Sequence, residues 1–176
     1  MVDQIEVLTA SITRHDQVIA SLFEAEGVAA ERVRALPGAG PILAPRIYVA
    51  LARHAPNCQD AESLAAAVGV APVTDQSGKM RKVYRRLRCD NHTRQTFIEW
   101  AKESWKHSVW AEAFVRQRKA KGQAFYAIIR ALAYKWIRLL WKCWHDGVAY
   151  HEETYLERLR EKGSPLVPPL PSPKAA

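Results

Sequence analysis

The chain has 176 residues, 48% of them hydrophobic, and its Lys and Arg residues outnumber Asp and Glu by 26 to 18. This length is sufficient for one sizeable core with an appended helix, and the net charge of +8 favours nucleic acid over an acidic small molecule as partner. No apolar run approaches the ~20 residues that cross a bilayer, which excludes a membrane-spanning protein.

Residues 3–26 are predicted to form one helix, which Gly27 ends. Its apolar residues recur on the first and fourth positions of a heptad, namely Ile5, Leu8, Ile12, Ile19 and Leu22. His15 occupies one seam position, so the segment suits either a dimer zipper or a helix that packs on a neighbour. The first ten residues place no cationic segment before an apolar one, so we expect no signal peptide and a cytoplasmic chain.

A glycine- and proline-rich turn follows at residues 36–44, which read LPGAGPILA. This segment resembles the hairpin of helix-hairpin-helix motifs. Gly38 and Gly40 permit positive φ and a close backbone approach, while Pro41 suits the first position of the next helix. Such hairpins present backbone N–H groups to a DNA phosphate, so we predict phosphate contacts at Gly38 and Gly40. A plain corner between two helices is the alternative.

The next segment is strongly basic. Asp60 is expected to cap a helix over 61–68 that Gly69 ends, and Ser77-Gly78 then forms a turn. Seven cations follow and face the single acid Asp90: Lys79, Arg81, Lys82, Arg85, Arg86, Arg88 and Arg94. We interpret residues 70–90 as a basic loop or short β-finger that binds nucleic acid. The alternative is a solvated basic face.

From residue 91 the chain is expected to be helical almost to its end. Five residues are predicted to supply a largely aromatic core: Phe97, Trp100, Ala101, Trp105 and Phe114. A helix over 123–145 has one apolar face, and its opposite face carries cations that we interpret as solvated: Arg130, Lys135, Arg138 and Lys142. Residues 163–176 are proline-rich and predicted to be disordered.

These elements together predict a mainly α fold. It comprises a coiled-coil-like connector at 1–35, a helical domain at 36–162 with the hairpin turn and basic finger, and the tail at 163–176. The three cysteines are expected to be reduced. A zinc site from His54, Cys58, Cys89 and His92 is the weaker alternative to reading these as small core or surface residues, because the Cys–x2–His spacing is uncommon. We therefore expect no metal site.

Four stretches, in this order, resemble the carboxy-terminal domain of a bacterial insertion-sequence transposase family. The stretches are LPGAGPILAPRI, AAAVGVAPVTDQSGK, TRQTFIEWA and KGQAFYAIIRALAYKWIRLLWKCWHDGVAYHEETYL. Members of that family, also called bridge-RNA-guided recombinases, join a four-carboxylate RuvC-like nuclease domain to a serine-bearing transposase domain. The resemblance implies DNA as partner, at transposon ends and target, and a structured guide RNA.

The same resemblance implies that Ser77 is a nucleophile that attacks a DNA phosphodiester and forms a phosphoserine link. A serine hydroxyl needs a base or a metal to take its proton, and nearby cations stabilise the charge that builds on the phosphoryl oxygens. Lys79, Arg81 and Arg85 are our candidates for that stabilising role, from their proximity in sequence. Without the resemblance, a Ser-Gly step indicates only a turn.

The family's RuvC-like half is expected before this region, and the sequence lacks it. Asp3, Glu6 and Asp16 cannot replace its metal cluster, because helical spacing spreads them around the axis. We therefore expect no cofactor in this chain and a divalent metal such as Mg²⁺ only in a RuvC-like domain. The chain is expected to form a homo-oligomer or to assemble with such a domain.

Two main functions follow from this reading. The first is a DNA transposase or recombinase domain that contributes the Ser77 nucleophile and is inactive alone. The second is a non-catalytic nucleic-acid-binding module, either a transposase remnant or a regulator. A helical oligomerisation protein whose charge serves solubility is the third and weakest reading. Only the first predicts a covalent protein–DNA adduct that Ser77→Ala abolishes.

Overall fold

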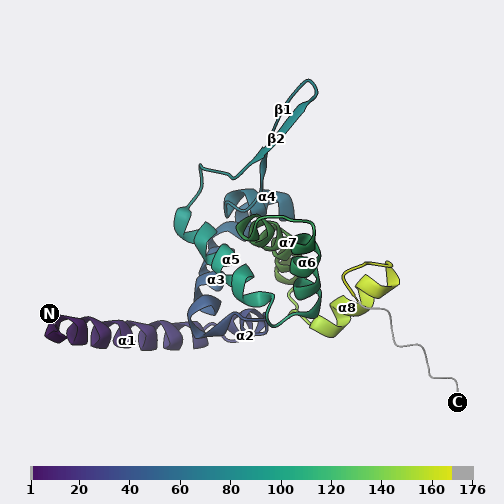
Figure 1. Ribbon diagram of the computed structural model, residues 1–176. Helices are drawn as coiled ribbons and strands as arrows, with labels where there is room; N and C mark the ends of the chain where they lie inside the picture. Colours follow the sequence, from purple (N-terminus) through teal and green to yellow (C-terminus); the bar gives the residue numbers. More distant parts are fainter. Residues whose placement is uncertain (1, 168–176) are drawn as a thin grey trace, which may run out of the picture.

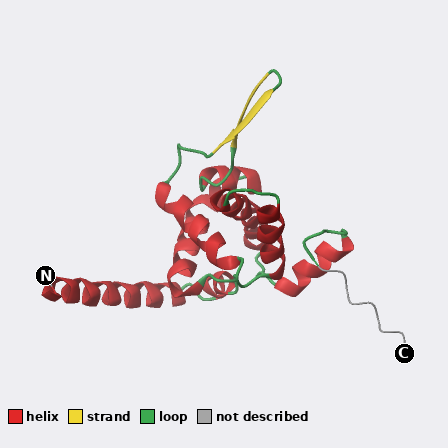
Figure 2. Cartoon of the chain, in the orientation of Figure 1, coloured by secondary structure: helices red, strands yellow, loops and turns green. Residues whose placement is uncertain are grey.

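The computed structural model describes residues 2–167, apart from the side chain of Arg81, and it is mainly helical, as predicted (Figure 2). The helices are α1 (Val2–Glu24), α2 (Val28–Arg34), α3 (Gly40–His54), the 3-10 turn η1 (Ala55–Asn57), α4 (Ala61–Ala67), α5 (Asn91–Ser104), α6 (Val109–Ala120), α7 (Phe125–Asp146) and α8 (Glu152–Glu161). A two-stranded sheet, β1 (Val73–Ser77) and β2 (Met80–Tyr84), separates α4 from α5.

The core lies where α3, α4, α5 and α6 pack around α7 (Figure 1). Its centre is a cluster of three fully buried indoles, with the Trp136 ring centroid 4.9 Å from that of Trp100 and 4.6 Å from that of Trp110. Phe97, Ala101 and Phe114 are also buried, as predicted, whereas Trp105 is only half-buried. Tilted aromatic pairs at these separations add to the stability gained from burial alone.

Every indole N–H of the central cluster has an acceptor. Trp100 Nε1 donates to the carbonyl of Pro37 at 2.9 Å, and Trp136 Nε1 donates to Ser104 Oγ at 2.8 Å. Trp110 Nε1 donates to the Tyr150 hydroxyl at 2.9 Å. Because a buried donor without a partner is costly, these bonds fix the rings and tie the 36–44 turn to α5.

Helix α1 extends away from the helical body (Figure 1). Phe23 is its only buried residue among those described, and the heptad residues predicted to form a seam are exposed; Ile12, for example, is 61% exposed. The predicted helix is confirmed, and it ends two residues earlier than expected. None of the helices within residues 2–167 combines the length and apolarity that a membrane span requires.

The end of the described chain folds back onto α6 and differs from the predicted tail. Gln117 Nε2 donates to the carbonyl of Pro165 at 2.6 Å, and Leu166 and Val167 are buried. Residues 163–167 thus have fixed packing partners where we expected disorder, because two apolar side chains offset the cost of ordering them. The rest of the predicted tail, residues 168–176, lies outside the described residues.

Candidate nucleic-acid interface

The predicted basic finger is an antiparallel β-hairpin that projects from the body beside α4 (Figure 1). Val73 pairs with Tyr84 and Ser77 pairs with Met80, which leaves Gly78 and Lys79 as a two-residue turn. Gly78 has φ 56°, while every non-glycine residue described has negative φ. Positive φ at the first central position only is the pattern of type II′ turns, whose twist matches the strands they join.

Ser77 is the last residue of β1 and lies exposed at the tip of this hairpin. Because side chains alternate along a strand, Asp75 lies on the same face as Ser77, and Lys82 is the cross-strand partner of Asp75 on that face. Asp75 was not among the predicted site residues, and the alternation of side chains along β1 is the signal that identifies it. No hydrogen bond joins the Ser77 hydroxyl to another of the described side chains.

The predicted basic residues separate into two groups. Lys79, Lys82, Arg85 and Arg88 are exposed on the hairpin or just beyond it, and none of them forms an ion pair with a described carboxylate. The side chain of Arg81 lies outside the description. Arg86 and Arg94 form the second group, at the root of the hairpin, where they are half-buried.

Arg94 connects the hairpin root to α5. Its Nη1 donates to the carbonyl of Arg86 at 2.8 Å and lies 3.2 Å from Cys89 Sγ, while its Nη2 donates to Asn91 Oδ1 at 2.7 Å. The Nε of Arg86 is buried without a hydrogen-bond partner. Arg94 therefore has a structural role, whereas Arg86 retains an unused donor.

Asp90, the acid that follows the basic residues of the hairpin, caps α5. It accepts hydrogen bonds from the Thr93 hydroxyl and the His92 backbone N–H, both at 2.9 Å. The Thr93 side-chain bond, followed by the Thr93 backbone bond, lowers the pKa of the Asp90 carboxyl. Arg53 lies 3.5 Å away. Asp90 is thus oriented toward helix α5 and Arg53, and it forms no ion pair with a described cation of the hairpin.

The turn at residues 36–44 is packed against the protein at Gly38. This glycine has φ 71°, and a Cβ there would lie 3.1 Å from the backbone of Glu103 and Ser104 and from the His107 ring. The close approach that glycine permits at this position is to α5, which gives Gly38 a packing role. Gly40, at the exposed start of α3 with φ 56°, has open space around it and remains a candidate for phosphate contact.

A groove of about 970 Å³ lies between the hairpin root and the helices α5, α6 and α7. We call it the basic groove. Six cations line it, namely Arg85, Arg86, Arg94, Arg118, Arg130 and Lys135, and its lining contains no Asp or Glu. Arg130 and Lys135 were predicted to be ordinary solvated side chains, and Arg118 was not among the predicted site residues. Their helical spacing predicts which face they share, but it does not reveal the hairpin root opposite.

Lys135 is the most desolvated cation of this groove. Burial, followed by the charges of Arg138 and Arg118, lowers the pKa of its ammonium group. Its Nζ lies 5.5 Å from the Phe114 ring centroid, and the guanidinium of Arg118 lies 4.6 Å from the same centroid. Two cations therefore share one aromatic ring, and their repulsion is only partly offset by the cation–π contacts.

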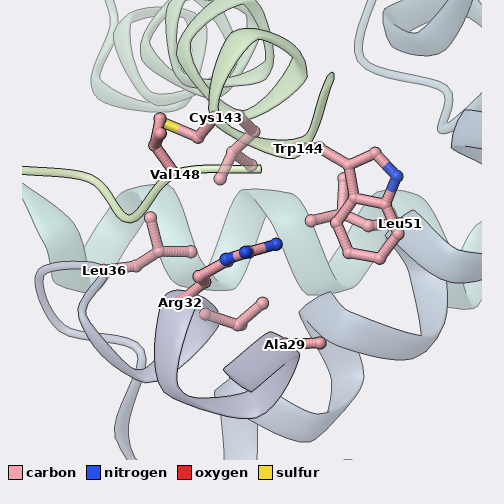
Figure 3. A pocket seen from close by; sticks show the side chains of 9 residues that line it. Ala29, Arg32, Leu36, Leu51, Cys143, Trp144 and Val148 are labelled. Carbon is pink, nitrogen blue, oxygen red and sulfur yellow. The ribbon is translucent and has the colours of Figure 1, made fainter. Parts of the chain in front are cut away.

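A smaller pocket of about 130 Å³ lies between α2, α3 and α7 and is mostly apolar (Figure 3). Arg32 projects into it between Leu36 and Trp144 (Figure 3). Its guanidinium also lies beside Gly147, where a Cβ would be 3.5 Å from Nη1. The carboxyl end of a helix carries partial negative charge, so the end of α7 stabilises the Arg32 guanidinium in this pocket.

Metal ligands do not gather in the structure. No group of three or more His, Cys, Asp or Glu that fits a metal ion occurs within residues 2–167. Cys58 Sγ donates to the carbonyl of His54, and Cys89 contacts Arg94, so neither thiol of the zinc alternative faces a ligand set. The residues present do not fit the divalent metal that the resemblance associates with a RuvC-like domain.

Comparison with known proteins places this interface in context. Residues 30–116 match the model of the transposase IS116/IS110/IS902 family, a match that contains the Gly38 turn, the hairpin and α5. A Streptomyces coelicolor protein that bears the name of a mini-circle transposase for IS117 is 29% identical over 123 residues, which are 70% of this chain and 30% of that protein. The chain thus spans about 30% of the length of this curated relative. This chain is therefore similar to the IS116/IS110/IS902 transposase family over residues 30–116, and to the IS117 protein over 123 residues.

Proposed function

We propose that this chain is the part of a DNA transposase that binds DNA and supplies the serine nucleophile for strand cleavage and exchange, with Ser77 as that nucleophile. One observation carries the proposal. The Ser77 hydroxyl is exposed at the tip of a projecting hairpin, next to cations without carboxylate partners among the described residues. The match of residues 30–116 to a transposase family supports DNA as the substrate on which that serine would act.

In the proposed reaction the Ser77 oxygen forms a bond to a backbone phosphorus while one sugar–oxygen bond to that phosphorus breaks. The hydroxyl proton passes to a base, and the leaving sugar oxygen takes up a proton. Negative charge builds on the phosphoryl oxygens, and our candidates for stabilising it remain Lys79, Arg81 and Arg85. Lys82 joins them because it lies on the face of Ser77. Strand exchange reverses the step when a new sugar hydroxyl displaces the serine oxygen.

The proposed reaction also needs a proton acceptor for the Ser77 hydroxyl. Asp75 lies on the face of Ser77, two residues away, and is the nearest carboxylate along the strand. A RuvC-like domain, with the metal it would hold, is the other source of a base. In that arrangement the hairpin inserts its tip into a site completed by another domain or another copy of the chain. The exposed apolar stripe of α1 would join the copies.

A covalent adduct is the test. The tagged chain is expressed in cells that carry the element encoding it, recovered under denaturing conditions, and examined for attached DNA and for a modified Ser77 peptide by mass spectrometry. We expect an adduct with the wild type and none with Ser77→Ala. Thr74→Ala is the matched control, because Thr74 is an exposed hydroxyl on the opposite face of the same strand. An adduct that persists in Ser77→Ala refutes the nucleophile assignment.

The second candidate is a non-catalytic nucleic-acid-binding module. It is favoured by the Ser77 hydroxyl having no hydrogen-bond partner among the described side chains, since an activated serine needs a base within reach. This candidate predicts salt-dependent DNA binding without any adduct, under conditions in which the element is mobile. Electrophoretic mobility shifts with the element's ends, measured beside the adduct assay, separate the two.

A further inference from the structure

The charge of the basic groove is unbalanced within the described chain. Six ion pairs join Lys or Arg to carboxylates elsewhere, on α1–α2, α3–α5, α5, α6 and α7. None of them involves a cation of the groove. Cations gathered in one hollow repel one another. Burial first, and the charges of Arg138 and Arg118 second, lower the pKa of Lys135. An arrangement of this kind is stabilised when an anion binds.

The side-chain type of the groove cations indicates which anion the groove binds. Five of the six groove cations are arginines, whose planar guanidinium donates in parallel to two oxygens of a phosphate. The side chain of Arg86 lines the groove, and its buried Nε has no hydrogen-bond partner among the described residues. The cations come from the hairpin root, α5, α6 and α7, so they line the groove on several sides. A chain of phosphates fits this distribution better than a single anion does.

Aromatic rings stand on two sides of the same groove. Tyr84, at the end of β2, is 49% exposed, and Tyr126, in the first turn of α7, is 61% exposed. The Phe125 ring meets that of Tyr126 edge-on, with 5.7 Å between the centroids, and supports it from the side. Exposed rings beside a basic groove are stacking platforms for bases. A base has a free face for such stacking only when its strand is unpaired.

We infer that the basic groove binds an unpaired segment of nucleic acid, with its phosphates on the groove arginines and its bases stacked on Tyr126 and Tyr84. The inference rests on the proposed function, since it gives the DNA-binding chain a second contact site. It also orients the ligand. The groove includes Val83–Arg86, the root of the hairpin that carries Ser77 about 13 Å farther along β1. A strand that leaves the groove along the hairpin therefore reaches the serine.

Fluorescence anisotropy on the whole chain tests this inference, with labelled dT12, rU12 and a 12-base-pair duplex as probes over a range of salt concentrations. We expect wild-type protein to bind a single-stranded probe more tightly than the duplex. The ratio between dT12 and rU12 affinities identifies DNA or RNA as the preferred source of the strand. Stronger duplex binding, or equal competition by polyglutamate, overturns the inference.

The variants separate stacking from charge. Tyr126→Ala should weaken single-strand binding about fivefold or more, and Tyr126→Phe should retain it, because the ring remains. Arg130→Gln should weaken binding and reduce the salt slope by about one, whereas Arg116→Gln, on the exposed face of α6 and paired with Glu112, should change neither. Wild-type affinity in Tyr126→Ala overturns the stacking role. Thermal unfolding of each variant confirms that it folds.

Failure of this inference is distinguishable from failure of the proposed function. Ser77→Ala should bind dT12 and rU12 like the wild type, since Ser77 does not line the groove. If groove variants leave single-strand binding intact while the Ser77 adduct still forms, the groove inference is wrong and the nucleophile stands. If Tyr126 and Arg130 govern binding and no adduct forms, the groove stands without the serine chemistry.

Discussion

The hairpin and the helical body differ in how far their side chains are buried. Every residue of β1 is exposed, and the two strands are held together by their own backbone pairing. In the body, by contrast, Trp136 is fully buried between two other indoles and its N–H is satisfied by Ser104. A hairpin of two strands gains little from burial. Its side chains are therefore better explained by a ligand, whereas those of the body are explained by packing.

A second contrast lies in the charges. Some cations on the helix surfaces are paired with carboxylates, as Lys142 is with Asp146 on α7. Arg130, on the same helix but in the basic groove, has no carboxylate within ion-pair distance among the described residues. Paired surface charges contribute little to stability, but unpaired ones in a groove reduce it until an anion binds. Two cations on one helix, Lys142 and Arg130, thus have different surroundings.

The largest expected effect is on the core. Trp136→Ala should lower the free energy of unfolding by about 3–5 kcal/mol, because it removes a fully buried ring from the indole cluster and leaves a cavity. Urea denaturation followed by tryptophan fluorescence measures it. A loss below about 1 kcal/mol would contradict the assignment of this cluster as the centre of the core.

The two glycines of the 36–44 turn provide a matched pair. Gly38→Ala should lower the free energy of unfolding by about 2–5 kcal/mol, since it combines positive φ with a Cβ pressed against the α5 backbone. Gly40→Ala meets open space and should cost only about 1–2 kcal/mol for its φ. The comparison is made by denaturant unfolding of the two variants, and equal losses would mean that the turn does not pack on α5.

Tyr150→Phe tests a buried polar contact beside the same cluster. The Tyr150 hydroxyl accepts from Trp110 Nε1 and donates to Glu152, and burial followed by that second bond raises its pKa. Removal of the Tyr150 hydroxyl should lower the free energy of unfolding by about 1–3 kcal/mol, because the Trp110 indole N–H is left without an acceptor. Tyr155→Phe is the control, since no hydrogen bond to the Tyr155 hydroxyl occurs among the described residues. Thermal unfolding of both variants measures the difference.

The smallest effect on stability is expected at the hairpin tip. Ser77→Ala should change the free energy of unfolding by less than about 0.5 kcal/mol, because the side chain is exposed and makes no hydrogen bond to a described side chain. Calorimetry of the variant beside the wild type provides the measurement. A clear destabilisation would show that Ser77 has a structural role and would weaken its assignment as a free nucleophile.

Local features of the fold could be predicted well. Asp60 caps α4 through a reciprocal bond with Ser63, Pro41 lies in the first turn of α3, and Gly147 ends α7 with φ 66°. Each of these depends on residues within a few positions of one another, so the chemistry is visible in a linear reading. The basic segment was predicted only as a loop or short β-finger over residues 70–90, and the structure has it as the hairpin of β1 and β2.

The candidate site was predicted only in part. Lys79, Lys82, Arg85 and Arg88 are exposed on or beside the hairpin, where we expected cations that contact nucleic acid. Arg94 is instead used to connect that hairpin to α5. No local pattern reveals this difference, because it depends on which carbonyl lies within reach of the guanidinium after folding. Whether the exposed cations contact phosphate remains a prediction.

The sequence by itself determined the helices, their caps, the turn at Ser77-Gly78 and the excess of positive charge, since short-range geometry and composition suffice for these. Only the tertiary structure decided that Gly38 faces α5, and that Arg118, Arg130 and Lys135 share a groove with Arg86 and Arg94. These residues are far apart in the chain. They meet because α7 buries its apolar face at the centre of the body, which turns its cations toward the hairpin root.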